Sequence, residues 1–421
     1  MSSGMLRGLE RSKKLKRIIL LFILTITVVA SLSACRQASD EVYMGGSSYI
    51  YDNILYFTEQ KYLKYTRFDT GETAVLCHDP LCKHDTEDCI AYLPNGFFYH
   101  LVVDEAASKN GIVLYVSYSY LKNITDFDQV HGIARIDFAE GKREMFADGL
   151  DCSAINQISI VGDKFYFIAT NTDDYYYRIF FLDKNGRNLT QLTETAEINY
   201  LLCAIEDGYF YYSDDFGNIY RTVDFTGQEL LYTSKHHYGF YIHNGYLYYC
   251  DDEVYELNEN LELPAYDYQT GKWGSYRWPT RSYTYYRIPL DDVSAEPQVV
   301  VDGALGTQQM LFTDTHLYAI SVMHKYLGMY TVYDPELKME IPEYVAVRTD
   351  GVLKVDLETL EVEKITIEGD WEIYGIISAD DEQIVFRGDH QRSKLENQMS
   401  HGIKIVIYNL KDQSYTIMTE N

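Results

Sequence analysis

Three cysteines and two histidines lie within fourteen residues, LCHDPLCKHDTEDC, from Leu76 to Cys89. Four of these side chains have the spacing C-x4-C-x-H-x4-C, at Cys77, Cys82, His84 and Cys89. Three thiolates and one imidazole suffice for a closed tetrahedral zinc site, with His78 as an alternative imidazole and Pro80 favouring a turn. Because four protein ligands leave no open position for water, a zinc ion here is expected to be structural.

A disulfide is the other interpretation of this cluster, because neighbouring cysteines of exported proteins commonly oxidise. A bridge from Cys89 to either Cys77 or Cys82 leaves one thiol over. In the third interpretation, the cysteines only fill a loop. Three other cysteines sit singly beside predicted strands and are expected to be small buried side chains: Cys152, Cys203 and Cys250.

The N-terminal residues have the pattern of a lipoprotein signal peptide. A basic run is followed by an apolar run of about fifteen residues, which is short for a membrane span of roughly twenty. The motif Leu32-Ser33-Ala34-Cys35 resembles a bacterial lipobox, whose cysteine carries the lipid. We expect residues 1–34 to be the signal peptide, Cys35 the lipid attachment site and residues 35–46 a tether. An uncleaved membrane helix and an ordinary cleavage site are the alternatives.

These features predict an exported protein, held by lipid at the extracellular face of the cell membrane. The chain has 36 Lys and Arg against 63 Asp and Glu, a formal net charge of −27. Nucleic-acid binding requires a basic surface, so this charge argues against a nucleic-acid partner. It also repels anionic headgroups, so the attached lipid is expected to make the membrane contact.

A repeated unit dominates the rest of the chain. The clearest copy, IEDGYFYYSDDFGNIYRTVDFTGQELLYT (residues 205–233), reads as four short strands separated by turns rich in Gly and Asp. We count seven such units, and the 41 tyrosines suit strands. A β-sandwich or a parallel β-helix fits this pattern less well. Residues 47–421 are therefore predicted to form an all-β propeller of about seven four-stranded blades, with six or eight as alternatives.

This unit resembles the YWTD repeat of propellers of the low-density-lipoprotein-receptor type. The motif residues are Tyr211, Tyr212, Ser213 and Asp214, and Asp224 and Gly227 match the later D-x-x-G turn. The Trp of the family motif is absent from every unit. The lipobox, the repeats and the segment C-x-D-P-x-C-x-H together resemble lipoproteins of unknown function from anaerobic Gram-positive bacteria. This resemblance implies the fold and the location but no activity, and in an anaerobe it favours metal over a disulfide.

Long insertions are predicted between the second and third strands of four units, at residues 117–132, 251–283, 323–344 and 388–402. In antiparallel blades these connections share one face with the crossovers between blades, so the cysteine cluster is expected there too. Because binding residues often lie on loops over a rigid scaffold, this is the expected functional face. The tight turns Asp207-Gly208 and Asn244-Gly245, between first and second strands, are expected to be structural only.

One insertion is rich in aromatic residues and contains the candidate binding residues Trp273, Tyr276 and Trp278. Such a platform can stack on sugar rings or anchor a peptide, and the alternative is a lid folded over the propeller.

The chain has no nucleophile elbow, zinc-protease motif, P-loop or dinucleotide-binding fingerprint. We therefore expect a non-catalytic binding or scaffolding module for a peptide, a protein or a glycan. The alternative is a hydrolase or lyase acting on polysaccharide through Asp or Glu on the loop face, which requires two carboxylates facing each other across a cleft. A structural lipoprotein that docks onto another envelope component is a third possibility.

Overall fold

The computed structural model describes residues 42–44, 48–59, 61–123, 128–170, 176–193, 199–235, 240–267, 272–304, 310–334, 338–391 and 404–420. The chain divides into two units, Met1–Val42 and Tyr43–Asn421. The predicted signal peptide, the lipid site Cys35 and most of the predicted tether lie outside the described residues. Within the described part of the chain, no helix has the length and apolar character needed to cross a membrane.

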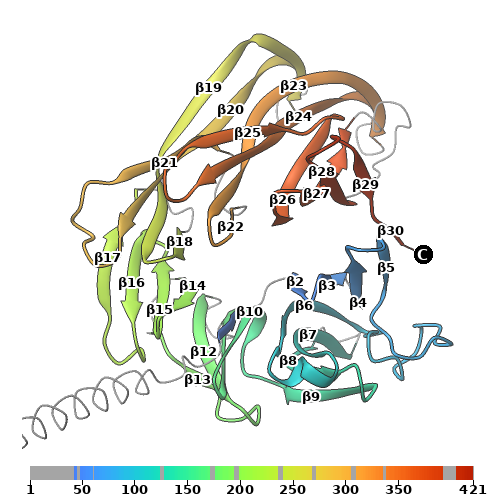
Figure 1. The fold of residues 1–421 in the computed structure, drawn as a ribbon. Coiled ribbons are helices and arrows are strands. Elements are labelled where there is room, and N and C mark those ends of the chain that lie inside the picture. The colour runs from blue at the N-terminus through green and yellow to red at the C-terminus, as the bar shows by residue number, and fades with distance from the viewer. Residues whose placement is uncertain are drawn as a thin grey trace, which may run out of the picture. The chain divides into compact units, whose positions relative to one another are not determined.

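The unit Tyr43–Asn421 is an all-β propeller, which confirms the predicted fold class. Its sheets are built mainly from strands that follow one another in the chain and pair antiparallel, as propeller blades require. Five of these sheets are blades of a ring, and a further sheet has eight strands (Figure 1).

The first blade contains both an early and the last strand of the described chain. Its strands are β2 (Ser48–Tyr51), β3 (Ile54–Glu59), β4 (Tyr62–Arg67), β5 (Glu72–Val75) and β30 (Thr419–Glu420). β30 pairs in parallel with β5, so the C-terminal strand closes the ring onto the first blade (Figure 1).

The next three blades follow in chain order. The second blade has β6 (Gly96–Val103), β7 (Val113–Asn123), β8 (Asp128–Asp137) and β9 (Lys142–Asp148), with the short 3-10 helix η1 (Ala107–Asn110) between β6 and β7. The third has β10 (Ser153–Val161), β11 (Lys164–Thr170), β12 (Tyr177–Asp183) and β13 (Thr190–Gln191), and β1 (Val42–Met44) stands beside β10 in its sheet order. The fourth has β14 (Tyr200–Glu206), β15 (Tyr209–Asp214), β16 (Asn218–Thr222) and β17 (Glu229–Thr233).

The eight-stranded sheet contains two successive runs of four strands. The first run is β18 (Phe240–His243), β19 (Tyr246–Asp267), β20 (Lys272–Pro289) and β21 (Gln298–Ala304). The second is β22 (Leu311–Phe312), β23 (His316–Asp334), β24 (Met339–Asp356) and β25 (Val362–Thr366). Pairing of Ala304 with Ser321 joins β21 to β23. The last blade has β26 (Trp371–Ala379), β27 (Gln383–His390), β28 (Lys404–Asn409) and β29 (Tyr415–Ile417).

Three of the four predicted insertions are paired strands instead of loops. The hairpins β7–β8, β19–β20 and β23–β24 continue their pairing to Asn123–Asp128, Asp267–Lys272 and Asp334–Met339, respectively. The sequences of these hairpins are rich in Tyr, Val and Thr, which favour strands, and pairing satisfies the backbone hydrogen bonds. Most of the fourth insertion lies outside the described residues.

The core lies between neighbouring blades, because each blade packs both of its faces. In β11 every residue from Phe165 to Thr170 is buried, as expected for a strand covered on two sides. Tyr211 packs towards the eight-stranded sheet, whereas the next residue, Tyr212, packs against the third blade. The YYSD motif is thus structural, and it fills two blade junctions at once.

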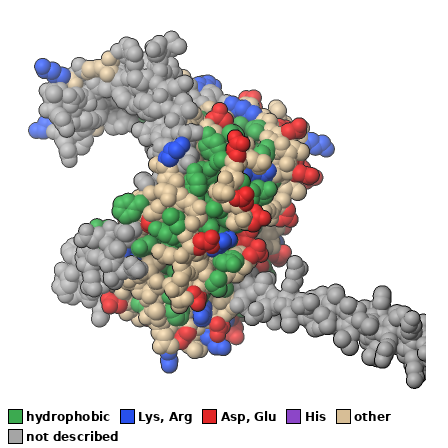
Figure 2. Space-filling model, turned by 90° about the vertical axis from the view of Figure 1, so that its left-hand side faces the viewer, with side chains coloured by type: hydrophobic (Ala, Val, Ile, Leu, Met, Phe, Trp, Pro, Cys, Tyr) green, Lys and Arg blue, Asp and Glu red, His purple; other side chains and the backbone are tan. Residues whose placement is uncertain are grey.

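Carboxylates and amides shape the turns of the repeat. Asp214 of the YYSD motif accepts backbone N–H groups from Phe216 (2.9 Å) and Asn218 (3.1 Å), which folds the turn between β15 and β16. At or just after the end of third strands, a side-chain oxygen accepts the N–H two residues further on at Asp183, Asp224, Asp292, Asp356 and Asn409. Figure 2 shows acidic side chains scattered among apolar ones on one side of the molecule, in keeping with the negative net charge.

Candidate metal centre

The cysteine segment, residues 76–95, connects β5 of the first blade to β6 of the second. At its start, the N–H of Leu76 donates to the carbonyl of Leu63 over 2.8 Å. Near its end, Tyr92 forms an isolated β-bridge with Tyr62, beside the turn between β3 and β4. The backbone of the first blade therefore holds both ends of the segment.

The four predicted ligands converge. Cys77, Cys82, His84 and Cys89 each bring one ligand atom to within 4.8 Å of the other three, and Nδ1 of His84 lies 3.4 Å from Sγ of Cys89. Around a tetrahedral zinc ion with bonds of about 2.3 Å to sulfur and about 2.0 Å to nitrogen, ligand atoms are about 3.5 to 3.8 Å apart. The cluster can therefore hold a metal ion after small side-chain adjustments.

The backbone N–H of His84 donates a hydrogen bond to Sγ of Cys82 over 3.4 Å. The backbone N–H groups of Asp79 and Ala91 favour the thiolates of Cys77 and Cys89, respectively. The thiolate is the form that binds a metal. His84 reaches this position with a positive φ of 56°, a conformation uncommon for a residue other than glycine.

Burial opposes this effect in the metal-free site. It raises the pKa of Cys77, and it raises the pKa of Cys89 to about 12, while the backbone N–H groups lower both. Metal binding must therefore displace protons at neutral pH. Only Cys89 is fully buried, and the other three ligands are partly exposed, so an ion can reach the cluster from solvent.

Arg143, in β9 of the second blade, holds the segment from the other side. Its guanidinium group donates hydrogen bonds to three backbone carbonyl oxygens, those of Glu87 (3.1 Å), Cys89 (3.3 Å) and Tyr92 (2.5 Å). No pattern in the sequence points to Arg143, because it lies more than fifty residues from its acceptors and belongs to no local motif.

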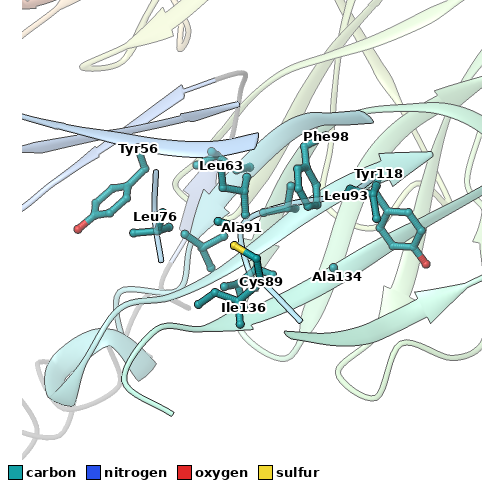
Figure 3. Close-up of a cluster of buried hydrophobic side chains, with 14 of the residues drawn as sticks. Tyr56, Leu63, Leu76, Cys89, Ala91, Leu93, Phe98, Tyr118, Ala134 and Ile136 are labelled. Carbon is teal, nitrogen blue, oxygen red and sulfur yellow. The ribbon is translucent and has the colours of Figure 1, made fainter. Parts of the chain in front are cut away.

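Cys89 is also part of the packing between the first two blades. It is 1% exposed and belongs to a hydrophobic cluster that contains Leu63 of β4 and Ile136 of β8. Figure 3 shows Cys89 beside Ala91 and Ile136 within this cluster. One ligand is thus built into the blade junction, so a bound metal would brace it.

Only one of the two candidate histidines joins the cluster. His84 is a ligand candidate, whereas His78 lies against Gly141 in the turn between β8 and β9. A Cβ added to Gly141 would lie 2.3 Å from Nε2 of His78.

The position of the cluster relative to the long hairpins is a separate question. The hairpin of β7 and β8 turns at the end of β8 opposite to Gly141, at Asn123–Asp128. At the hairpin end of the second blade, however, the carbonyl of Asn95 accepts the N–H of Leu121. The expectation that the cluster shares a face with the long insertions therefore stays a prediction.

The predicted binding residues Trp273, Tyr276 and Trp278 lie in β20, in the long hairpin with β19. In the backbone pairing, Trp273 is opposite Tyr266 and Tyr276 is opposite Leu263. Their hairpin belongs to the eight-stranded sheet, whereas the metal cluster lies in the segment between the first and second blades, so the structure does not bring the two candidate sites together. Their role in binding stays a prediction.

The cysteines of the cluster are present as thiols, and the described Cys152 and Cys250 are buried thiols, as expected. The side chain of Cys203 lies outside the described set.

Comparison with solved structures agrees with the propeller fold. The chain is similar to oligopeptidase B from Leishmania major, with a TM-score of 0.50, 8% identity and coverage of 91% of this chain and 49% of that one. It is also similar to a post-proline cleaving enzyme from Rickettsia typhi (TM-score 0.43, 11% identity, 92% and 53% covered). For the nidogen/laminin complex the TM-score is 0.32, with 9% identity and coverage of 89% and 92%.

These likenesses are distant and concern the fold alone. The chain spans about half the length of the two peptidases that it resembles. Neither a protein-family model nor a curated protein matches the chain. The fold and the site thus define a class, a β-propeller with a four-residue cluster that can hold a metal ion between two blades.

Proposed function

We propose that this protein is a non-catalytic binding or scaffolding module, tethered by a lipid on Cys35 to the extracellular face of the cell membrane. In this proposal it belongs with the propeller lipoproteins that its sequence resembles, and its ligand is a peptide, a protein or a glycan. The observation that carries the proposal is the four-ligand cluster at the junction between the first and second blades. A rigid ring braced by a four-ligand cluster suits a scaffold, and three paired hairpins extend from it as contact surfaces.

The ring has seven blades in this proposal. The eight-stranded sheet then counts as two blades, one from β18 to β21 and one from β22 to β25. After its third strand, each run has a turn in which an Asp side chain accepts the N–H two residues further on, at Asp292 and at Asp356. This repeated turn supports the division.

The cluster holds one structural Zn²⁺. Three thiolates and an imidazole form a donor set that zinc prefers in structural sites, and backbone N–H groups favour the thiolates of Cys77 and Cys89. Four protein ligands leave no position for a reacting water, which agrees with a role in stability.

Elemental analysis and thiol titration of the mature protein, purified without air, test the zinc site. We expect about one zinc per chain, in agreement with one four-ligand site. His84→Asn should release the metal, whereas the matched variant His78→Asn should retain it. A metal-free protein with a single free thiol among the three cluster cysteines would instead support a disulfide and refute the zinc site.

Binding of envelope components to the purified protein tests the scaffold role, with turnover measured in the same samples. Retention of a polysaccharide or peptide without any turnover supports the proposal. Turnover that a single Asp→Asn substitution abolishes would refute it.

A hydrolase or lyase is the second candidate, favoured by one pair of acidic residues. Glu372 of β26 and Asp389 of β27 are direct partners in the sheet. Paired carboxylates are what general acid and base chemistry needs. However, the two residues are only 2% and 3% exposed, so a polymer could not reach them without rearrangement. We therefore favour the binding role.

A further inference from the structure

A groove with a volume of about 430 Å³ lies between the fourth blade and the eight-stranded sheet. This volume is within the range of small-molecule sites, about 300 to 1,000 Å³. Side chains that line it include Asp207, Tyr209, Arg221, Tyr246, Pro289 and Asp291.

The groove lies at the ends of the blades that face away from the long β19–β20 hairpin. Tyr246 begins β19 and pairs with Pro289 at the end of β20, whereas the hairpin turns at Asp267–Lys272. On the other wall, Asp207 belongs to the turn between β14 and β15, and Tyr209 follows it. The tight turns that were expected to be structural therefore also build a recess. In the sequence, the recess could have been recognised from two similar triplets, Asp207-Gly208-Tyr209 and Asn244-Gly245-Tyr246.

Arginines hold the aromatic rings of both walls. The guanidinium group of Arg221 lies 5.0 Å from the centre of the Tyr209 ring, and that of Arg287 lies 4.5 Å from the centre of the Tyr246 ring. Arg221 is also bonded to Glu229 over 2.6 Å, which balances its charge. Arg287 donates to the side chain of Gln298 over 2.9 Å. The tyrosines are thus positioned before any ligand arrives.

Charge restricts the class of ligand. Asp207 and Asp291 are exposed carboxylates at the groove, and the chain has a net charge of −27, so an anion would be repelled. A cation would gain less from Tyr209 and Tyr246 than from free rings, because each ring already has an arginine over it. The groove suits a neutral ligand, because its rings can pack against an apolar face and its carboxylates can accept hydrogen bonds from hydroxyl groups.

We infer that the groove binds one or two units of a neutral saccharide. The sugar ring stacks on Tyr209 or Tyr246, and its hydroxyl groups donate hydrogen bonds to Asp207 and Asp291. This inference rests on the proposed binding function, to which it adds a ligand class and a place. It is independent of the metal cluster, which lies between the first and second blades.

Calorimetric titration of the full-length mature protein tests the site. The probes are neutral tetrasaccharides of glucose, mannose and N-acetylglucosamine, with tetragalacturonate as the anionic comparison. At least one neutral tetrasaccharide should bind. Tyr209→Ala and Tyr246→Ala should each weaken that binding by about tenfold, the effect of losing one stacking contact. Tyr333→Ala is the matched control, since Tyr333 is 59% exposed on the distant β23 hairpin.

Three outcomes would overturn the groove inference. In the first, only tetragalacturonate binds. In the second, a neutral saccharide binds with the same affinity to both groove variants; loss of that binding in Trp273→Ala would move the site to the hairpin and leave the proposed function intact. In the third, no saccharide binds at all. Capture of a peptide or an envelope protein by the same sample would then separate failure of the groove from failure of the proposed function.

Discussion

The guanidinium group of Arg143 lies 3.3 Å from the backbone carbonyl oxygen of Cys89, although the two residues are 54 positions apart in the chain. Arg143 belongs to the outermost strand of the second blade, and Cys89 is a candidate metal ligand in the segment that leaves the first. This bond makes the cluster part of the junction between two blades. Stability of the ring and occupation of the cluster are therefore expected to depend on each other.

Replacement of Arg143 tests this coupling. Arg143→Ala removes a hydrogen-bond donor from three carbonyl oxygens, so we expect the free energy of unfolding to fall by about 1 to 3 kcal/mol. Urea denaturation of the metal-loaded protein measures it. Lys142→Ala is the control, because its ion pair with Glu144 is exposed to solvent and should contribute little to stability. Equal effects of the two substitutions would contradict the coupling.

Removal of the metal should destabilise the propeller. A strong chelator is expected to lower the free energy of unfolding of the metal-loaded protein by about 3 kcal/mol or more, because the ion binds the folded cluster and not the separated ligands. Thermal unfolding with and without chelator measures this change. Cys82→Ser should begin at the lower stability and show no response to chelator. A chelator effect of the same size in both proteins would show that the ion acts elsewhere.

Acid should destabilise the propeller by protonating the Asp carboxylates that accept N–H groups in the turns after the third strands. Backbone N–H groups lower the pKa of Asp183 and Asp356, and the side chain and backbone of Thr226 lower that of Asp224. Since each pKa is lower in the folded than in the unfolded state, the stabilisation is complete above about pH 5 and is lost as the pH falls below about 4. Urea denaturation across this range measures the change. A chelator keeps the protein metal-free at every pH, so that release of metal by acid does not contribute.

The control for this prediction is Asp183→Asn. An amide oxygen can still accept the N–H groups of the turn, but it does not titrate in this range. The variant should lose less stability than the parent on acidification. A parallel decline of both proteins would assign the acid sensitivity to other groups.

A methyl group at Gly141 should disturb the contact between the cluster segment and the second blade. Gly141 has a φ of +61°, and an added Cβ would lie 2.3 Å from Nε2 of His78. We expect Gly141→Ala to destabilise the protein by about 1 to 3 kcal/mol, from backbone strain and from the clash. Adding His78→Ala should recover the part due to the clash and leave the strain. A double variant no more stable than Gly141→Ala would show that the contact with His78 contributes nothing to the loss of stability.

Local patterns predicted much of this protein. Each strand of a blade is a short run of apolar and aromatic residues between turns, so periodicity and turn residues were enough to predict the propeller. The four ligands were also predictable as a group, because they lie within thirteen residues and a segment of that length can bring them together.

Long-range contacts decided the remaining features. Which histidine joins the cluster depends on the turn at Gly141, and the position of the cluster depends on packing against Leu63 and Ile136. The groove exists because Tyr209 and Tyr246 are brought opposite each other by neighbouring sheets.

The sequence by itself thus determined the strands, the repeat and the set of candidate ligands, because these follow from interactions between residues near in the chain. Only the tertiary structure decided that the cluster joins two blades and that structural turns form a recess. Those features come from contacts such as that of Arg143 with Cys89, whose partners share no local pattern and meet only when the ring has closed.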